Sequence, residues 1–142
     1  MGAKRRKTRK QVIVTGYAKM WPRKVFDLVT GKRNRLFVRD EKLLAAPGVY
    51  VLYRDDHPYY VGKTMKLWHR IWNHANQPKD KWYNFWNFFS AFIVPDRRHL
   101  AEVEGILIAA MPTENSANPR IQKITLPTKA IKALRRKPIP VQ

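Results

Sequence analysis

Residues 47–64 read Pro-Gly-Val-Tyr-Val-Leu-Tyr-Arg-Asp-Asp-His-Pro-Tyr-Tyr-Val-Gly-Lys-Thr. Two short runs in this stretch, 49–53 and 59–61, are rich in the β-branched and aromatic residues that favour strands. Between them, Asp55-Asp56-His57-Pro58 is composed of turn-forming residues. So short a connection predicts an antiparallel hairpin. Gly62 is expected to end it.

The side chains of this hairpin alternate between two faces. Val49, Val51 and Tyr53 are predicted on one side of the first strand, and Tyr50 and Leu52 on the other. Tyr50 and Tyr60 lie on paired strands, so their side chains are expected to face each other. Tyrosines in strands usually serve packing, so this pair alone indicates no function.

Helices and further strands are predicted on either side of the hairpin. Thr64 is a plausible N-cap for a helix that runs to about Asn76, before Pro78. The continuously apolar run 88–94 predicts a central strand, and a second helix is expected over 98–110. A short basic helix is expected over 128–137. Short strands are also expected at 12–14 and 36–38.

The first predicted helix places two reactive side chains together. Arg70 and His74 are i, i+4 neighbours beside the apolar Leu67 and Ile71. A cation and a titratable imidazole therefore project from one face. The alternative is a surface arginine with a partly exposed histidine.

The second predicted helix carries an unusual carboxylate. Glu104 shares a face with Leu100, Leu107 and Met111, whereas Glu102 lies on another face that reaches water. Burial of an unpartnered carboxylate costs several kcal/mol. We therefore expect Glu104 to have a partner, either a divalent cation or the basic group of a structural ion pair.

Composition points to a polyanionic partner. The 142 residues suit one domain, and 29 Lys and Arg against 10 Asp and Glu give a formal net charge of +19. No apolar segment is long enough to span a bilayer. No signal peptide is recognised, and there is no cysteine. The expected location is the cytoplasm in association with nucleic acid, or the nucleus or an organelle of a eukaryote.

The first ten residues form a dense basic block. They are expected to contact phosphates rather than base edges, with a solvated tail or a nuclear-import signal as alternatives. The cations in this block are Lys4, Arg5, Arg6, Lys7, Arg9 and Lys10.

The order of these features resembles the GIY-YIG nuclease family. Gly48-Val49-Tyr50 and Tyr60-Val61-Gly62 correspond to the two naming motifs, each with Val in place of Ile. Lys63, Arg70 and His74 follow at the family's spacing, and then come Glu104 and a Pro-x-x-Asn segment ending at Asn115. The resemblance covers about residues 47–118.

The resemblance implies an α/β (α+β sandwich) fold with a small three-stranded antiparallel sheet flanked by helices. It also implies a division of the chain, which we write as a basic flexible arm (1–10), an N-terminal extension packed on or beside the core (11–46), a nuclease domain (47–126) and a basic C-terminal tail or short helix (127–142).

By the same resemblance, the activity is hydrolysis of phosphodiester bonds in DNA, double-stranded or branched, with one Mg²⁺ or Mn²⁺ held by Glu104. Tyr50 is the implied general base, and Lys63, Arg70 and the metal would lower its pKa from about 10. Arg70 would bind the phosphate together with Lys63. Tyr60 would orient the phosphate or the water, and His74 would hydrogen-bond Tyr50 or relay its proton.

Three alternatives stay open. Asn115 is implied to support the glutamate or its loop, but nearby Asn118 also precedes a proline. The aromatic loop 79–87 suits packing, nucleic-acid contact through Trp82 or Tyr83, or a homodimer interface, and a homodimer would allow double-strand cleavage. A non-catalytic nucleic-acid-binding protein would have the same charge, but would have no reason to keep Glu104.

Overall fold

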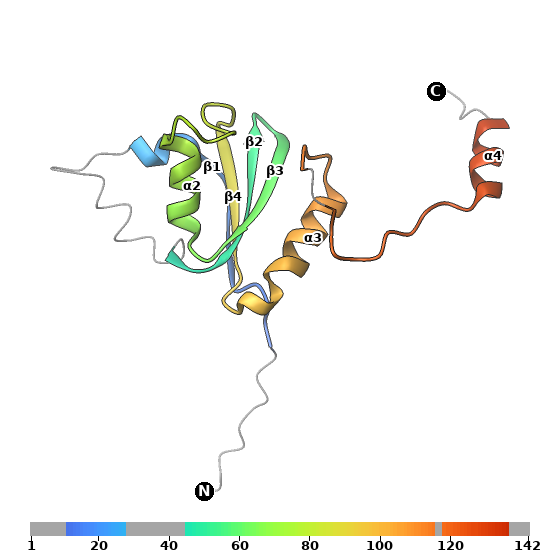
Figure 1. Cartoon of the computed structure of the whole chain (residues 1–142), viewed down its shortest axis with the longest axis horizontal. Helices are drawn as coiled ribbons and strands as arrows, with labels where there is room; N and C mark the ends of the chain where they lie inside the picture. The colour runs from blue at the N-terminus through green and yellow to red at the C-terminus, as the bar shows by residue number, and fades with distance from the viewer. Residues whose placement is uncertain (1–10, 28–44, 116–117, 137–142) are drawn as a thin grey trace, which may run out of the picture.

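The computed structural model describes residues 11–27, 45–115 and 118–136. The predictions for the basic block at 1–10 and for a strand at 36–38 lie outside these residues. The elements in chain order are β1 (Gly16–Pro22), the 3-10 helix η1 (Arg23–Asp27), β2 (Gly48–Arg54), β3 (His57–Thr64), α2 (Leu67–Asn76), β4 (Phe88–Ile93), the 3-10 helix η3 (Arg97–His99), α3 (Leu100–Ala110) and α4 (Thr128–Arg136) (Figure 1).

The strands form one antiparallel sheet in the order β1-β4-β2-β3. The predicted hairpin is β2–β3, and the predicted central strand is β4, so the mixed α/β fold class is confirmed. The sheet nevertheless has four strands rather than three. The fourth, β1, runs from Gly16 to Pro22, and the strand predicted at 12–14 is wrong, because those residues form no strand.

The sequence missed β1 because its side chains do not alternate between apolar and polar. Ala18 is its one buried residue, and the pairing with β4 is interrupted between Ala18 and Trp21, where Met20 adopts a left-handed backbone (φ 52°). Backbone pairing with β4 therefore makes this strand, not a period-two pattern.

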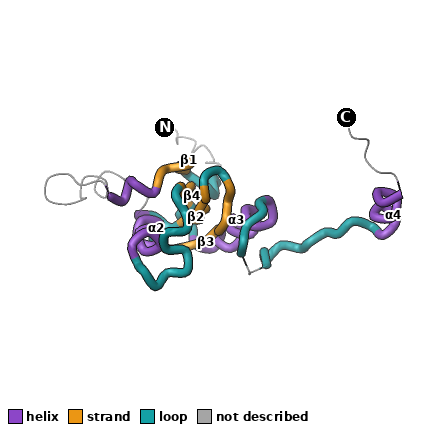
Figure 2. The backbone as a smooth tube through the Cα atoms, turned by 90° about the horizontal axis from the view of Figure 1, so that it is seen from above, coloured by secondary structure: helices purple, strands orange, loops and turns teal. Residues whose placement is uncertain are grey.

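Each face of the sheet has its own apolar core and its own helix. Tyr50, Leu52 and Phe89 pack with Leu67 and Ile71 of α2. On the opposite face, a set of valines packs with α3 (Val49, Val51, Val61, Val94, Leu100, Val103 and Leu107). The strands lie between α2 and α3 when viewed from above (Figure 2). The predicted alternation along β2 is confirmed.

The predicted N-cap at Thr64 is wrong. Thr64 is the last residue of β3, and its hydroxyl accepts a hydrogen bond from the Lys66 backbone N–H (3.1 Å), which closes a turn before α2 starts at Leu67. The helix ends at Asn76 as predicted. The second predicted helix is divided into η3 and α3, with Asp96 capping η3 through the Arg98 N–H.

Candidate active site

A chain of three side chains runs from the sheet through α2 into the loop that follows. The Tyr50 hydroxyl lies 2.7 Å from Nε2 of His74, and Nδ1 of His74 lies 2.8 Å from Oδ1 of Asp80. A carboxylate only accepts hydrogen bonds, so Nδ1 carries the proton of a neutral imidazole and Nε2 accepts from Tyr50. The sequence had paired His74 with Tyr50, but had not singled out Asp80.

Burial sets the protonation of this chain. His74 is 1% exposed, and desolvation lowers its pKa below the usual value, helped by the charge of Arg70 and opposed by Asp80. Histidine is therefore neutral at physiological pH and free to accept a proton. The alternative of a partly exposed histidine is wrong, because His74 lies on the face of α2 that packs against the sheet.

Burial has the largest effect on the pKa of Tyr50. Its side chain is 1% exposed, and burial raises its pKa well above the usual value, with a further increase from Tyr60. Arg70 works against this by charge and hydrogen bonding. Without a metal ion, desolvation outweighs the charge of Arg70, and the lowering of the Tyr50 pKa by a bound metal stays a prediction.

Gly62 is required by this arrangement. A Cβ built at this position would overlap the ring and hydroxyl of Tyr50, which sits opposite Gly62 in the β2–β3 register. Tyr60 pairs with Leu52, two positions along, so the two tyrosines are diagonal neighbours on one face with ring centroids 6.1 Å apart. The glycine after Tyr60-Val61 thus leaves room for the phenol of Tyr50.

A cavity of about 300 Å³ opens beside His74. Arg70 and Lys81 supply positive charge along its wall, and Asp80 and Glu114 supply negative charge. Tyr60 and Trp82 supply rings whose centroids lie 5.2 Å apart. Lys81 Nζ lies 5.1 Å from the centroid of the Trp82 ring. The cations and the aromatic rings suit a phosphate and its attached nucleoside, and the two carboxylates oppose the negative charge of a phosphate.

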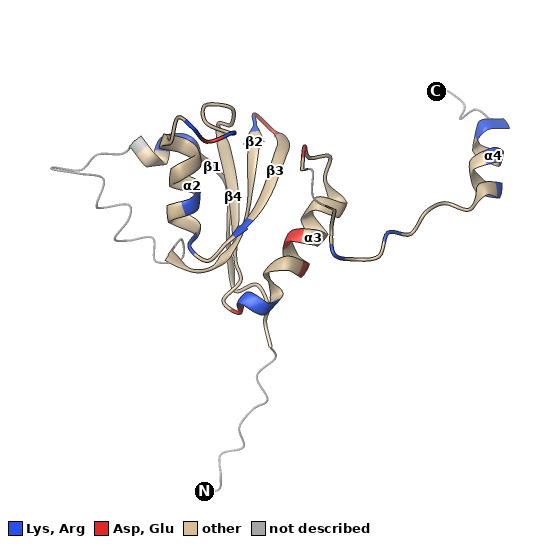
Figure 3. Ribbon diagram, in the orientation of Figure 1, with Lys and Arg blue, Asp and Glu red and all other residues tan. Residues whose placement is uncertain are grey.

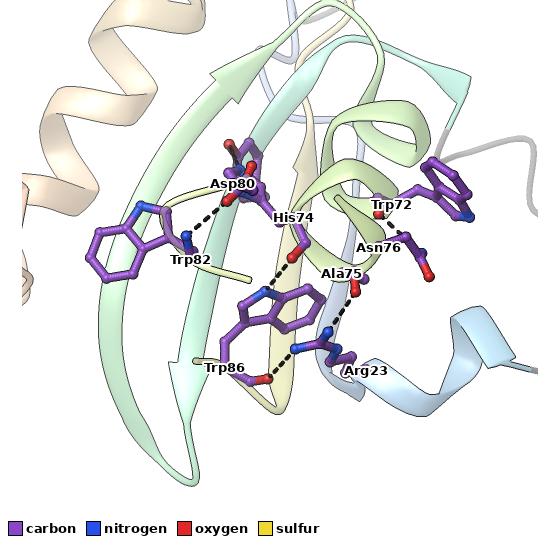
Figure 4. A network of polar contacts seen from close by, with 9 residues as sticks. Arg23, Trp72, His74, Ala75, Asn76, Asp80, Trp82 and Trp86 are labelled. Atoms are coloured by element: carbon purple, nitrogen blue, oxygen red, sulfur yellow. Dashed lines mark hydrogen bonds and ion pairs between the residues drawn. The ribbon is translucent and has the colours of Figure 1, made fainter. Parts of the chain in front are cut away.

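The C-terminal end of α2, which carries His74, is fixed from the other side by Arg23 of η1. Its guanidinium donates to the carbonyls of Ala75 (2.5 Å) and Trp86 (3.3 Å), and Trp86 Nε1 donates to the His74 carbonyl at 3.4 Å (Figure 4). A cation at a helix C-terminus is favourable. The residues before the hairpin therefore help to hold the site, a role the sequence did not reveal.

Glu104 lies on the other side of β3. Its carboxylate is 3.3 Å from Nζ of Lys63, and the two side chains are 19% and 45% exposed. Glu104 therefore sits at the core boundary with Lys63 as its partner, which is the ion pair expected as the alternative to a metal ion. Lys63 and Val49 are opposite in the register, so this pair belongs to the α3 face, whereas Tyr50, Arg70 and His74 belong to the α2 face.

The donor set suits a magnesium ion that keeps most of its waters. Among the described residues, no three His, Cys, Asp or Glu side chains gather as metal ligands. Mg²⁺ is often held by one or two carboxylates together with water and substrate phosphate. The partly exposed carboxylate of Glu104 fits that pattern, and Lys63 is exposed enough to move aside.

Asn115 ties its loop to the edge of the sheet. Its Oδ1 accepts from the Val61 N–H (2.9 Å), and its Nδ2 donates to the Val61 carbonyl (2.7 Å). The Glu114 N–H also bonds the Tyr59 carbonyl at 2.7 Å. The segment after α3 is thus hydrogen-bonded to β3 at Tyr59 and Val61. Asn118, by contrast, is exposed.

The aromatic loop serves packing for the most part. Trp86 is 2% exposed in the core of the α2 face, whereas Trp82 stands between Tyr60 and Phe85 at the cavity.

No helix in the part of the chain that is described has the length and apolar character needed to cross a bilayer.

Comparison with known proteins gives matches among the solved structures only. No family model and no curated protein matches the chain. Five chains among the solved structures match. They are GIY-YIG N-terminal endonuclease domains of UvrC from Thermotoga maritima. The magnesium-bound domain is 25% identical with a TM-score of 0.45, over 55% of this chain and 93% of that one.

Two point mutants of the same domain, each bound to its catalytic divalent cation, give similar values. They are 24% and 25% identical, both with a TM-score of 0.46, over 58% and 57% of this chain and 97% of theirs. The motifs of this chain resemble the family to which these domains belong.

Proposed function

We propose that this chain is a GIY-YIG-type endonuclease that hydrolyses phosphodiester bonds in DNA with one divalent ion, magnesium or manganese. The observation that carries the proposal is the hydrogen-bonded chain from Tyr50 through His74 to Asp80, next to Arg70 and the cavity. A histidine hydrogen-bonded to a phenol on one side and to a carboxylate on the other has the arrangement that general-base catalysis requires.

In this mechanism Tyr50 conducts a proton without becoming a phenolate. The attacking water gives its proton to the Tyr50 oxygen while Tyr50 gives its own to Nε2 of His74. The water oxygen bonds to phosphorus, the bond to the 3′ oxygen breaks, and that oxygen takes a proton from solvent. His74, now an imidazolium, is stabilised by Asp80 and later loses its proton to solvent.

The other residues bind and orient. Arg70 offers two parallel hydrogen-bond donors to the phosphate. Burial opposes the charged form of Arg70, but the interaction with Tyr50 outweighs burial and raises the pKa of Arg70. Tyr60, on the cavity wall, orients the phosphate or the water. Glu104 would hold the metal ion, which would supply positive charge to the phosphate and the leaving oxygen. Lys63, its exposed partner in this structure, would contact the DNA backbone.

The test is incubation of the full chain with supercoiled, linear and branched DNA, with and without magnesium. Glu104→Ala is expected to abolish magnesium-dependent cleavage and to leave DNA binding nearly unchanged. Glu102→Ala, which removes an exposed carboxylate two residues away on the same helix, is the matched control and should cleave normally. Cleavage that survives Glu104→Ala would overturn the metal assignment.

A wild-type chain that binds DNA and cleaves none of these substrates with either metal would favour the alternative, a non-catalytic basic nucleic-acid-binding protein. The net charge of +19 supports both functions equally, so only the cleavage assay separates them.

A further inference from the structure

The C-terminal helix α4 stands apart from the rest of the molecule. It has no buried residue, and the preceding segment 120–127 is exposed throughout. Figures 1 and 3 show it at the end of an extended connection, with Lys and Arg along it. A helix of nine residues is marginal in water without a partner. Its partner must therefore come from outside the body of the protein.

The charge of this segment selects the partner. Residues 118–136 contain no Asp or Glu, and their cations are Arg120, Lys123, Lys129, Lys132, Arg135 and Arg136. The four in α4 fall within one side of a helical projection, opposite Ile131 and Leu134. Two large apolar residues bury too little area for stable attachment to a membrane surface. A cationic face on a tether suits the phosphates of a nucleic acid.

The tether has a defined origin. The ring of Pro119 packs over Gly105 of α3, with its Cβ 3.5 Å from where a side chain at 105 would begin. This places the start of the tether one helical position from Glu104. From Pro119 to Thr128 the chain spans at most about 30 Å at 3.3–3.6 Å per residue. That distance equals roughly nine base pairs of duplex at 3.4 Å each.

We propose that α4 is a tethered anchor that binds the phosphate backbone up to about nine base pairs from the scissile phosphate. This rests on the proposed DNA substrate, but it concerns binding and not hydrolysis. The anchor raises affinity through the effective concentration that the tether provides. It reads no bases, because its cations meet phosphates.

The experiment compares the full chain with the variant K129Q/K132Q/R135Q/R136Q, in EDTA, on duplexes of about 10 and about 30 base pairs. The body variant K19Q/K24Q/R54Q/R97Q removes the same charge from exposed positions and serves as control. On the long duplex, the slope of log affinity against log salt should be less steep for the α4 variant than for the wild type. The difference should be up to about 3.6, which is about 0.9 for each of the four cations removed. A fourfold rise in salt would then weaken the wild type about 100-fold more than the variant.

Duplex length separates an anchor from general charge. The wild type should gain affinity from the short to the long duplex, the α4 variant should lose that gain, and the body variant should keep it. A circular-dichroism increase in helix on adding long duplex, absent in the α4 variant, is also expected.

Equal salt slopes for wild type and α4 variant, or an equal length gain, would overturn the anchor. The same holds if the α4 charges affect binding to phosphatidylserine vesicles but not to DNA. Because EDTA removes the metal, a chain that never cleaves DNA still tests the anchor, and a failed anchor leaves the cleavage assay intact.

Discussion

Replacement of Asp80 by Asn tests the proton relay at its hidden end. Asp80 Oδ1 accepts from His74 Nδ1 and from the Trp82 N–H, each at 2.8 Å, and Asn keeps the shape of the side chain while removing its charge. The side chains of His74 and Asp80 are 2% and 11% exposed, so solvent screens their interaction weakly. The imidazolium formed during the reaction would lose its counter-charge.

The size of the effect follows from that geometry. Unit charges about 4 Å apart at an effective dielectric constant of about 20 attract by about 4 kcal/mol. At about 1.4 kcal/mol per factor of ten, the single-turnover cleavage rate should fall about a thousandfold, within the usual range for general-base catalysis. DNA affinity should be unchanged, and Asp56→Asn in the exposed hairpin turn is the matched control.

Two further readouts distinguish a relay from a structural role. Asp80 raises the pKa of His74, so its replacement should move the acidic limb of the pH–rate profile to lower pH. Imidazole ¹⁵N shifts should show the Nδ1–H tautomer in the wild type and a loss of that preference in the variant. A variant that cleaves at the wild-type rate, with an unmoved acidic limb, would refute the relay.

Three other changes have defined outcomes. Gly62→Ala should destabilise the fold by about 1–3 kcal/mol, measured by urea unfolding, because the new Cβ overlaps Tyr50; wild-type stability would contradict this packing. Asn115→Ala should cost about 1–2 kcal/mol by the same assay and speed proteolysis after α3, because both hydrogen bonds to Val61 are lost; Asn118→Ala, at an exposed position, should change neither. The pKa of His74 is lower in the folded chain than in the unfolded chain, so His74 binds a proton more readily when the chain is unfolded. The free energy of unfolding should therefore fall as pH drops below about 6.5. His74→Gln should flatten that dependence, whereas His69→Gln should retain it.

Much of the fold was predictable because it follows local patterns. The β2–β3 hairpin, the central β4 and the end of α2 were all visible as strand runs, a short turn and a helical face. β1 was not, because it is held by backbone pairing to β4 and shows no alternation. Thr64 was misplaced because a hydroxyl that closes a turn after a strand has the same sequence pattern as an N-cap.

The candidate site divides in the same way. Sequence order alone selected Tyr50, Tyr60, Arg70 and His74, and the fold gathers them on the α2 face. The sequence left a divalent cation or a basic group as the partner of Glu104, and only the structure showed Lys63 beside it. Asp80 and Arg23 were missed, because each acts through a tertiary contact that no motif or periodic spacing in the sequence indicates.

The sequence by itself determined which side chains are present, the order of the motifs, the two periodicities and a net charge of +19. Those follow from the identity of neighbouring residues and need no knowledge of distant contacts. Tertiary structure decided the protonation of the site, because desolvation depends on what covers a group and not on its neighbours in the chain. Burial makes Tyr50 a poor phenolate and His74 a neutral acceptor, and a loop residue, Asp80, completes the route for the proton.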